Sequence, residues 1–161
     1  MGNDVRVKTG DGAEMAALFS AASLTPAPGI LVLHEIFGMT DFIRSRLPLF
    51  NAQGYTAMAP DLYHRIKPGV SYDYAGADWE RAFMTRNSLD DDLAVEDIGV
   101  AVAALTARPE CNGEVVVVGY CLGGLLALLS AARLRVLANI CFHGVRLEKP
   151  LVEAQSIPGP F

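Results

Sequence analysis

The sequence predicts an α/β protein whose sheet is mostly parallel. Short apolar runs alternate along the chain with segments whose apolar residues recur at helical spacing, and this alternation is typical of βαβ units. The start of the chain differs, because Val5–Thr9 and Met15–Ser20 flank the turn Gly10-Asp11-Gly12 and indicate a β-hairpin. The 161 residues are enough for one hydrophobic core, so we expect residues 1–161 to form a single domain.

Each later element is predicted by a local signal. Short apolar runs predict buried strands over Ile30–Leu33, Tyr55–Ala59, Val115–Val118 and Leu134–Phe142. Apolar residues at helical spacing predict helices over Asp41–Gln53, Trp79–Arg86, Ser88–Arg108 and Leu125–Ala132. Ser88 is the expected N-cap of the third helix, because three aspartates follow it in the first turn. Polar stretches predict loops over Tyr63–Ala77 and Pro109–Gly113.

Composition and charge exclude several kinds of partner and cofactor. A net charge of −5 and the absence of a Lys/Arg-rich run argue against binding to nucleic acid or to an anionic membrane. The first twenty residues contain no apolar stretch of the kind that signal peptides carry. Three cysteines are an odd number for a disulfide framework, and their spacing matches no zinc site. We therefore expect a cytoplasmic protein with neither a metal nor an organic cofactor.

The run Val115–Ala132 carries no charge and admits two interpretations. Its length is that of a membrane-spanning helix, and it contains a G-x-x-x-G pattern of the kind that packs such helices together. Alternatively, it is a strand, a tight turn over Gly119–Gly124 and a helix. Four consecutive valines favour a strand, and three glycines in the turn weaken any continuous helix. The surrounding α/β pattern favours the second interpretation.

In the second interpretation, Gly119-Tyr120-Cys121-Leu122-Gly123 matches the nucleophile elbow G-x-S-x-G, with cysteine in place of serine. A nucleophile on a strand-to-helix turn needs very small neighbours two positions away on each side, which Gly119 and Gly123 supply. The helix that follows would help to stabilise a thiolate on Cys121, and the Leu122 amide would face a developing oxyanion. The alternative is that Cys121 is a buried structural thiol.

Four segments together resemble the dienelactone hydrolase family, a branch of the α/β-hydrolases. They are HEIFG at 34–38, QGYTAMAPDLY at 53–63, GYCLGG at 119–124 and GVRLEK at 144–149. The resemblance covers nearly the whole chain. It implies an α/β-hydrolase-type fold and a hydrolase that acts on lactone or carboxylic ester bonds of a small-molecule substrate.

The resemblance also assigns roles to individual residues. It makes Cys121 the nucleophile, Glu35 the carboxylate that contacts the resting thiol and takes part in its activation, and the backbone amides of Ile36 and Leu122 the oxyanion hole. An arginine from the region of residues 65 to 86 would bind a substrate carboxylate, and Arg81 and Arg86 are the candidates, with Arg81 preferred. The alternatives are that Glu35 is a solvated loop acid or a helix cap and that Arg81 is a surface charge.

The histidines do not complete a catalytic triad. His34 is expected to point away from Glu35 and to be structural, and His64 is expected to be solvated. After Cys121 the sequence contains one histidine, His143, and no aspartate, whereas the family places its acid after the next strand and its histidine later still. His143 is therefore not the expected triad base.

The end of the sequence suggests only the N-terminal part of a hydrolase domain. Ile157–Phe161 resembles the start of the family's next core strand, so we expect the C-terminal strands to be missing. Three hypotheses remain open: a hydrolase, an inactive fragment or half of a split enzyme, and a redox-sensing cysteine protein on a hydrolase scaffold. The strand Leu134–Phe142 would leave an exposed apolar edge through which the chain could self-associate.

Overall fold

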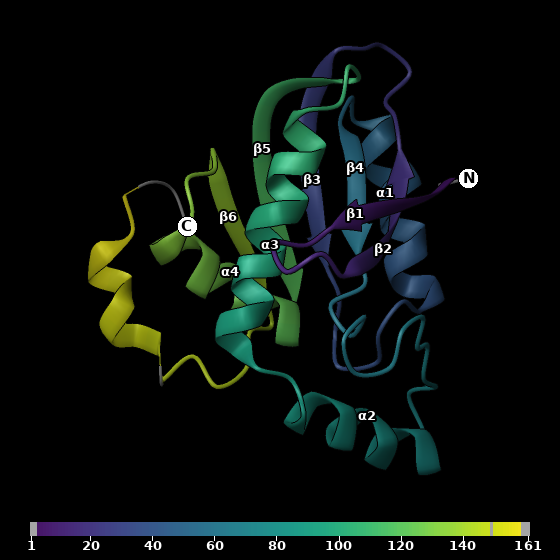
Figure 1. Cartoon of the computed structure of the whole chain (residues 1–161), viewed down its shortest axis with the longest axis vertical. Helices are drawn as coiled ribbons and strands as arrows, with labels where there is room; N and C mark the ends of the chain where they lie inside the picture. The colour runs from purple at the N-terminus through teal and green to yellow at the C-terminus, as the bar shows by residue number, and fades with distance from the viewer. Residues whose placement is uncertain (1–2, 149, 159–161) are drawn as a thin grey trace.

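The computed structural model describes residues 3–148 and 150–158, which form a six-stranded sheet with helices on both faces (Figure 1). In chain order the elements are β1 (Asn3–Lys8), β2 (Glu14–Ser20), β3 (Ala27–Leu33), α1 (Asp41–Ala52), β4 (Thr56–Pro60), α2 (Ala77–Asn87), α3 (Asp91–Thr106), β5 (Cys111–Tyr120), α4 (Leu122–Arg133), β6 (Ala138–Phe142) and the 3₁₀ helix η1 (Pro150–Ser156).

The sheet is mostly parallel and begins with an antiparallel hairpin, as predicted. The strand order is β1-β2-β4-β3-β5-β6. β1 pairs with β2 and β2 with β4 in antiparallel fashion, whereas β4, β3, β5 and β6 are parallel to one another. The predicted fold class is therefore confirmed.

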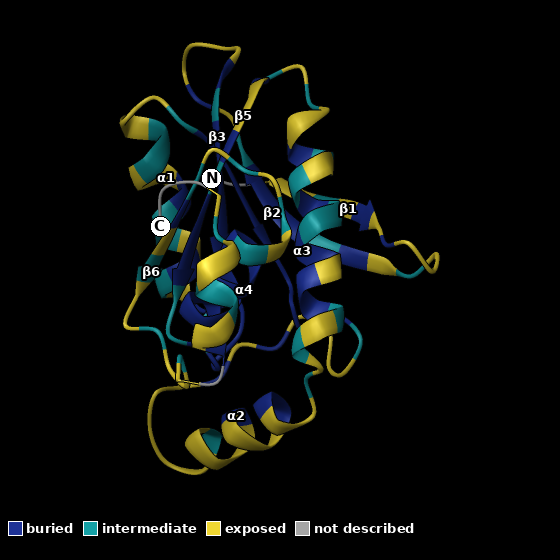
Figure 2. Cartoon of the chain, turned by 90° about the vertical axis from the view of Figure 1, so that its left-hand side faces the viewer, coloured by how far each residue is buried: buried dark blue, intermediate teal, exposed yellow. Residues whose placement is uncertain are grey.

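The helices cover the sheet unequally. α3 and α4 pack on one face, and α1 packs on the opposite face against β2, β4 and β3. Figure 1 shows α2 beyond the end of the sheet where the parallel strands finish. Figure 2 shows the central strands buried and α2 exposed over most of its surface. The carboxyl ends of the parallel strands are thus bordered by α2 and by the loop that leads to it.

Two hydrophobic clusters hold these layers together. The larger one lies between the sheet and helices α3 and α4 and includes Ile98, Leu105 and Leu126, none of which is accessible to solvent. The smaller one lies on the α1 face and includes Ile43 and Leu47. Full burial of one such aliphatic side chain contributes roughly 1.5–3 kcal/mol, so these clusters fix the positions from which the strand ends extend.

The uncharged run Val115–Ala132 forms a strand, a turn and a helix. β5 ends at Tyr120 and α4 begins at Leu122, so Cys121 alone forms the turn that the sequence placed over Gly119–Gly124. Within the described part of the chain, no helix combines the length and the apolar character needed to cross a membrane.

The prediction that Ser88 caps the third helix is wrong. Ser88 instead ends α2, where its hydroxyl donates to the carbonyl oxygen of Met84 at 3.2 Å. The N-cap of α3 is Asp90, whose carboxylate accepts from the backbone amides of Asp92 and Leu93. An aspartate is as good an N-cap as a serine, and the extended backbone of Asp90 lets its carboxylate reach two free amides.

Two strand boundaries also differ from the prediction. β5 already begins at Cys111, within the predicted loop, and accommodates Gly113 at φ 95°. β6 covers only Ala138–Phe142, because the chain from Leu134 first returns from α4 before it pairs with β5. The last predicted strand start, Ile157–Phe161, lies in part outside the described residues, and Ile157 and Pro158 follow η1 directly.

Candidate active site

The backbone at Cys121 forms a sharp, strained elbow between β5 and α4. Cys121 has φ 54° and ψ −108°, a region that residues other than glycine rarely adopt. A Cβ atom at Gly119 would overlap the backbone of Gly123, and one at Gly123 would overlap the carbonyl of Leu33. Both glycines are therefore required by the close approach of strand and helix, as the sequence pattern predicted.

The sulfur of Cys121 lies at two backbone amides. The backbone N–H groups of Leu122 and Ile36 lie close enough to the sulfur to lower the pKa of the thiol. Burial raises the pKa of the Cys121 thiol, and the carboxylate of Glu35 raises it further, whereas the two amides and the Arg86 guanidinium lower it. The net direction is upward, so Cys121 is a protonated thiol at rest, and the helix N-terminus does not by itself produce a thiolate at neutral pH.

The pairing of β3 with β5 brings Glu35 to this cysteine. Leu33 pairs with Gly119 in the parallel ladder, and the Gly123 amide donates to the carbonyl of His34 at 3.1 Å. Glu35 therefore follows β3 next to the elbow, half-buried, where its charge acts on Cys121. The structure brings together Glu35, Ile36, Cys121 and Leu122, which the sequence had singled out.

His34 is buried behind this arrangement and is neutral. Its Nδ1–H donates to the carbonyl oxygen of Glu35 at 2.6 Å, and its Nε2 accepts from the amide of Leu62 at 3.1 Å. These two bonds fix one neutral tautomer, and burial lowers the pKa of the imidazole. The ring thus ties the turn after β3 to the turn after β4, consistent with the expected structural role.

The two candidate arginines have different surroundings. Arg81 lies on the solvent side of α2, with 63% of its side chain exposed, and its guanidinium donates to Asp78 at 2.8 Å. The side chain of Arg86 is only 9% exposed and pairs with Asp91 at 2.9 Å. Only Arg86 acts electrostatically on Cys121. The sequence offered both arginines and favoured Arg81, because nothing in the local pattern distinguishes a buried arginine at the end of an exposed helix.

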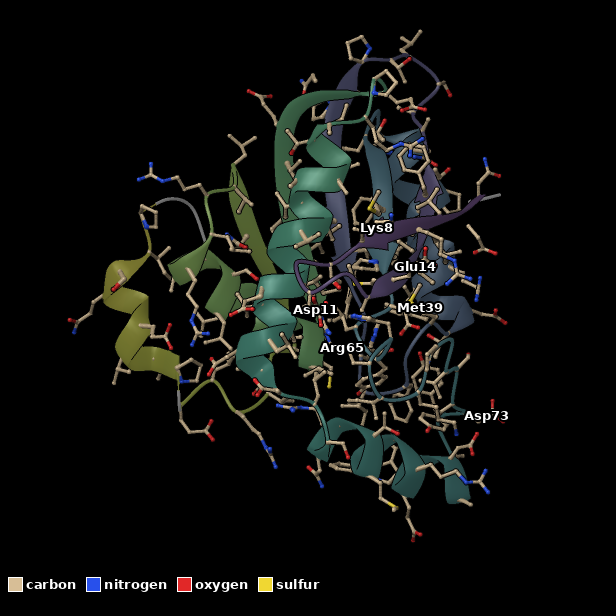
Figure 3. All side chains as sticks on the ribbon, in the orientation of Figure 1. Lys8, Asp11, Glu14, Met39, Arg65 and Asp73 are labelled. Carbon is tan, nitrogen blue, oxygen red and sulfur yellow. The ribbon has the colours of Figure 1, made fainter. Side chains whose placement is uncertain are left out.

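His64 is buried, so the prediction that it is solvated is wrong. Its Nε2 lies 3.4 Å from Asp97 Oδ2. Arg65 binds Asp97 at 2.8 Å and Asp11 at 2.6 Å, and Figure 3 shows Asp11 and Arg65 side by side. This ion-pair network draws the loop after β4 onto α3 and covers His64.

His143 lies near the elbow without completing it. The amide of Cys121 donates to the carbonyl of Phe142 at 2.9 Å, which places His143 just after the point of contact. The residue is exposed, at φ 53°, and its imidazole forms no hydrogen bond with any described residue. Within residues 3–148 and 150–158, no group of three His, Cys, Asp or Glu side chains is placed to hold a metal ion.

One family model and several curated proteins match this chain. The model of the dienelactone hydrolase family matches residues 15–161. The carboxymethylenebutenolidase of Pseudomonas putida is 36% identical over 157 residues, which are 97% of this chain and 66% of that protein. Carboxymethylenebutenolidase 1 of Cupriavidus pinatubonensis is 33% identical over 161 residues, which are 99% of this chain and 69% of that protein. The chain thus spans about two thirds of the length of these curated relatives.

Solved structures agree with this match. The structure named m3DLH has a TM-score of 0.77 at 25% identity, with 99% of this chain and 65% of that chain covered. A dienelactone hydrolase-like promiscuous phosphotriesterase, P91, from metagenomic libraries has a TM-score of 0.71 at 25% identity, with 98% and 66% covered. Because the family model matches most of this chain, the chain belongs to the dienelactone hydrolase family.

Proposed function

We propose that the protein is a hydrolase of lactone or carboxylic ester bonds and that Cys121 is its nucleophile. The observation that carries the proposal is the position of the Cys121 sulfur, on a strained elbow and at the amides of Leu122 and Ile36. The curated relatives named carboxymethylenebutenolidase support the choice of lactones and esters.

The first half of the reaction forms a thioester. Glu35 accepts the thiol proton, and the thiolate of Cys121 attacks the carbonyl carbon of the substrate. The amides of Leu122 and Ile36 donate to the oxygen that becomes negative, as in an oxyanion hole. The bond to the leaving oxygen then breaks, and that oxygen takes the proton from Glu35.

The second half releases the acyl group. A water molecule attacks the thioester carbon, the two amides again hold the oxyanion, and the carbon–sulfur bond breaks to give a carboxylic acid and the Cys121 thiol. Arg81 is the proposed contact for a substrate carboxylate, for which it would exchange its ion pair with Asp78. After Cys121 this sequence contains no aspartate, and its one histidine, His143, is not the expected triad base. The base that activates the water is therefore not assigned to a residue.

A thiol with a raised pKa favours this proposal over a redox sensor. Oxidants attack thiolates, and a sensor cysteine needs a lowered pKa. Burial and the Glu35 carboxylate act in the opposite direction on Cys121. A chain that acylates but does not turn over would instead be one half of a split enzyme, and one that does neither would be an inactive fragment.

The test is phenolate release from p-nitrophenyl acetate by the wild type, Cys121→Ser and Cys141→Ser. Cys141 is partly exposed like Cys121 but lies in β6, where its sulfur is beside Gly124 and Gly144, so it is the matched control. We expect Cys141→Ser to retain the rate and Cys121→Ser to lose at least 90% of it, roughly tenfold or more, because a serine depends wholly on its base. Equal rates for the wild type and Cys121→Ser would refute the nucleophile assignment.

A further inference from the structure

The loop before α2 is fastened directly to the segment that carries Glu35. The amide of Met39 donates to the carbonyl of Val70 at 2.8 Å, and the amide of Tyr72 donates to the carbonyl of Phe37 at 2.9 Å. Gly38 bridges Ser71 in antiparallel fashion at φ 80°, and a Cβ atom at Gly38 would overlap Val70. The loop is therefore held in a fixed register, although it is one of the most exposed parts of the chain.

This register places Tyr74 on Glu35. The Tyr74 hydroxyl donates to Glu35 Oε2 at 2.7 Å, a length typical of a charge-assisted bond. The ring of Tyr74 packs on Phe37 with centroids 4.6 Å apart, and Phe37 also packs on Trp79 at 5.3 Å. The loop continues past Asp73, labelled in Figure 3, towards α2.

A second hydroxyl completes a chain of donors. Tyr74 Oη lies 3.2 Å from Thr40 Oγ1, and either oxygen could be the donor. An ionised carboxylate only accepts, so the single phenolic hydrogen is committed to Glu35 and Thr40 must donate to Tyr74. Burial raises the pKa of Tyr74, as does the Glu35 carboxylate, so the phenol keeps this hydrogen throughout the neutral range.

We infer that Tyr74 is a positioning residue for Glu35: its hydroxyl holds the carboxylate in one orientation beside Cys121, from which Glu35 can accept the proton of the thiol. This inference rests on the role proposed above for Glu35. A hydrogen bond to the charged form of a carboxyl group favours that form, and hence extends its ionised range towards lower pH.

The charged and titratable groups around Glu35 are few. Cys121 faces it from the elbow and Tyr74 from the loop. Arg86, at the end of α2, acts on Cys121. His34 precedes Glu35 and is held neutral by its two hydrogen bonds, which involve the backbone and not the carboxylate. Tyr74 is thus the group whose removal changes the hydrogen bonding of the carboxylate without changing a nearby charge.

The direct test is an NMR titration of the side-chain carboxyl carbons in protein labelled with 13C-glutamate. Glu35→Gln identifies the Glu35 signal by its disappearance. In Tyr74→Phe, which keeps the aromatic ring, we expect the Glu35 midpoint to rise by about half to one pH unit. Thr40→Val, which removes the second donor, should shift it in the same direction by less. Because this readout needs no substrate, it remains informative even if the chain hydrolyses nothing.

The matched control is Tyr72→Phe. The Tyr72 hydroxyl lies in the same loop but bonds Thr85 at 2.9 Å and not Glu35. This variant can lose stability, but it should leave the Glu35 midpoint where the wild type has it. The inference is overturned if the Glu35 midpoint in Tyr74→Phe equals that of the wild type. It is also overturned if Tyr72→Phe moves the midpoint as far as Tyr74→Phe does.

The pH profile of Cys121 acylation separates this inference from the proposed function. Tyr74→Phe should move the acid limb of that profile upward by the same shift, and the effect should vanish in the Glu35→Gln background. If Glu35→Gln leaves the limb in place, the proposed role of Glu35 is wrong. If the limb depends on Glu35 and Tyr74→Phe does not move it, the inference fails and the proposed function stands.

Discussion

At the scale of single residues, Glu35 has two opposite effects on Cys121. Its negative charge raises the pKa of the thiol and so reduces the fraction of thiolate at neutral pH. The same carboxylate is the proposed acceptor of the thiol proton when substrate is bound. A partly buried thiol that stays protonated at rest and loses its proton only when an ester is bound would account for a carboxylate and a cysteine sharing this site.

These two effects predict opposite changes in Glu35→Gln. Alkylation of Cys121 by the small neutral reagent iodoacetamide near pH 8 should become roughly three- to tenfold faster, because the negative charge that disfavours the thiolate is gone. Acylation by p-nitrophenyl acetate should become at least tenfold slower, because the proton acceptor is gone. Rates for both reagents are measured on the same preparations, and changes of the same sign would contradict the proposed role of Glu35.

The candidate site residues that the sequence singled out belong to short contiguous motifs. Cys121, Leu122, Glu35 and Ile36 each lie at a strand end whose pattern specifies the turn. The sequence did not predict the contact of Tyr74 with Glu35. Tyr74 lies in a loop whose course depends on backbone hydrogen bonds to residues 37–39. The sequence likewise could not distinguish Arg86 from Arg81, because their exposure depends on how the end of α2 packs.

At the scale of elements, the ends of β3, β4 and β5 hold the site together. His34 connects the first two of them through hydrogen bonds to Glu35 and Leu62. The strands and helices themselves were predictable, because apolar periodicity is a local signal. The boundaries of these elements were less predictable. Ser88 and Asp90 lie two residues apart and could both cap α3, and only the backbone course between α2 and α3 decides between them.

The buried imidazole predicts a pH dependence of stability. Because burial lowers the pKa of folded His34 below its unfolded value near 6.5, the unfolded chain binds the proton more readily. The stabilisation is therefore complete above about pH 6.5 and is lost as the pH falls, by at most about 1.4 kcal/mol per pH unit. His34→Gln can make both hydrogen bonds without titrating, since an amide both donates and accepts.

Urea unfolding at pH 7.5 and pH 5.5 checks this prediction. The free energy of unfolding should fall between these pH values by about 1 kcal/mol less in His34→Gln than in the wild type. If the two proteins lost stability in parallel, titration of His34 would not contribute to acid destabilisation.

At the scale of the whole molecule, one face of the sheet is only partly covered. α1 packs against β2, β4 and β3, and beside it an apolar groove of about 370 Å³ extends over β5 and β6. The groove is lined in part by Val118, Ile140 and Phe142, and the last two are more than 40% exposed. β6 also forms the edge of the sheet, so unpaired backbone groups adjoin an apolar surface.

We expect this surface to bind a second copy of the chain. Ile140→Lys places a charge in the groove and at the edge strand, which should lower the dimer fraction at least threefold at a given concentration, an effect of about 0.6 kcal/mol or more. Leu24→Lys, at a side chain that is 86% exposed and does not line the groove, is the control. Sedimentation equilibrium over a range of concentrations measures both, and a wild type that remains monomeric throughout would refute the expectation.

The proposed role of Cys121 as an activated nucleophile can be tested by intact-mass spectrometry. The protein is incubated briefly with p-nitrophenyl acetate, its mass is compared with the 17.2 kDa of the chain, and the modified peptide is sequenced. We expect a single acetyl group, located on Cys121 and absent from Cys121→Ser. An unmodified Cys121, or an acetyl group on Cys111 or Cys141 instead, would contradict it.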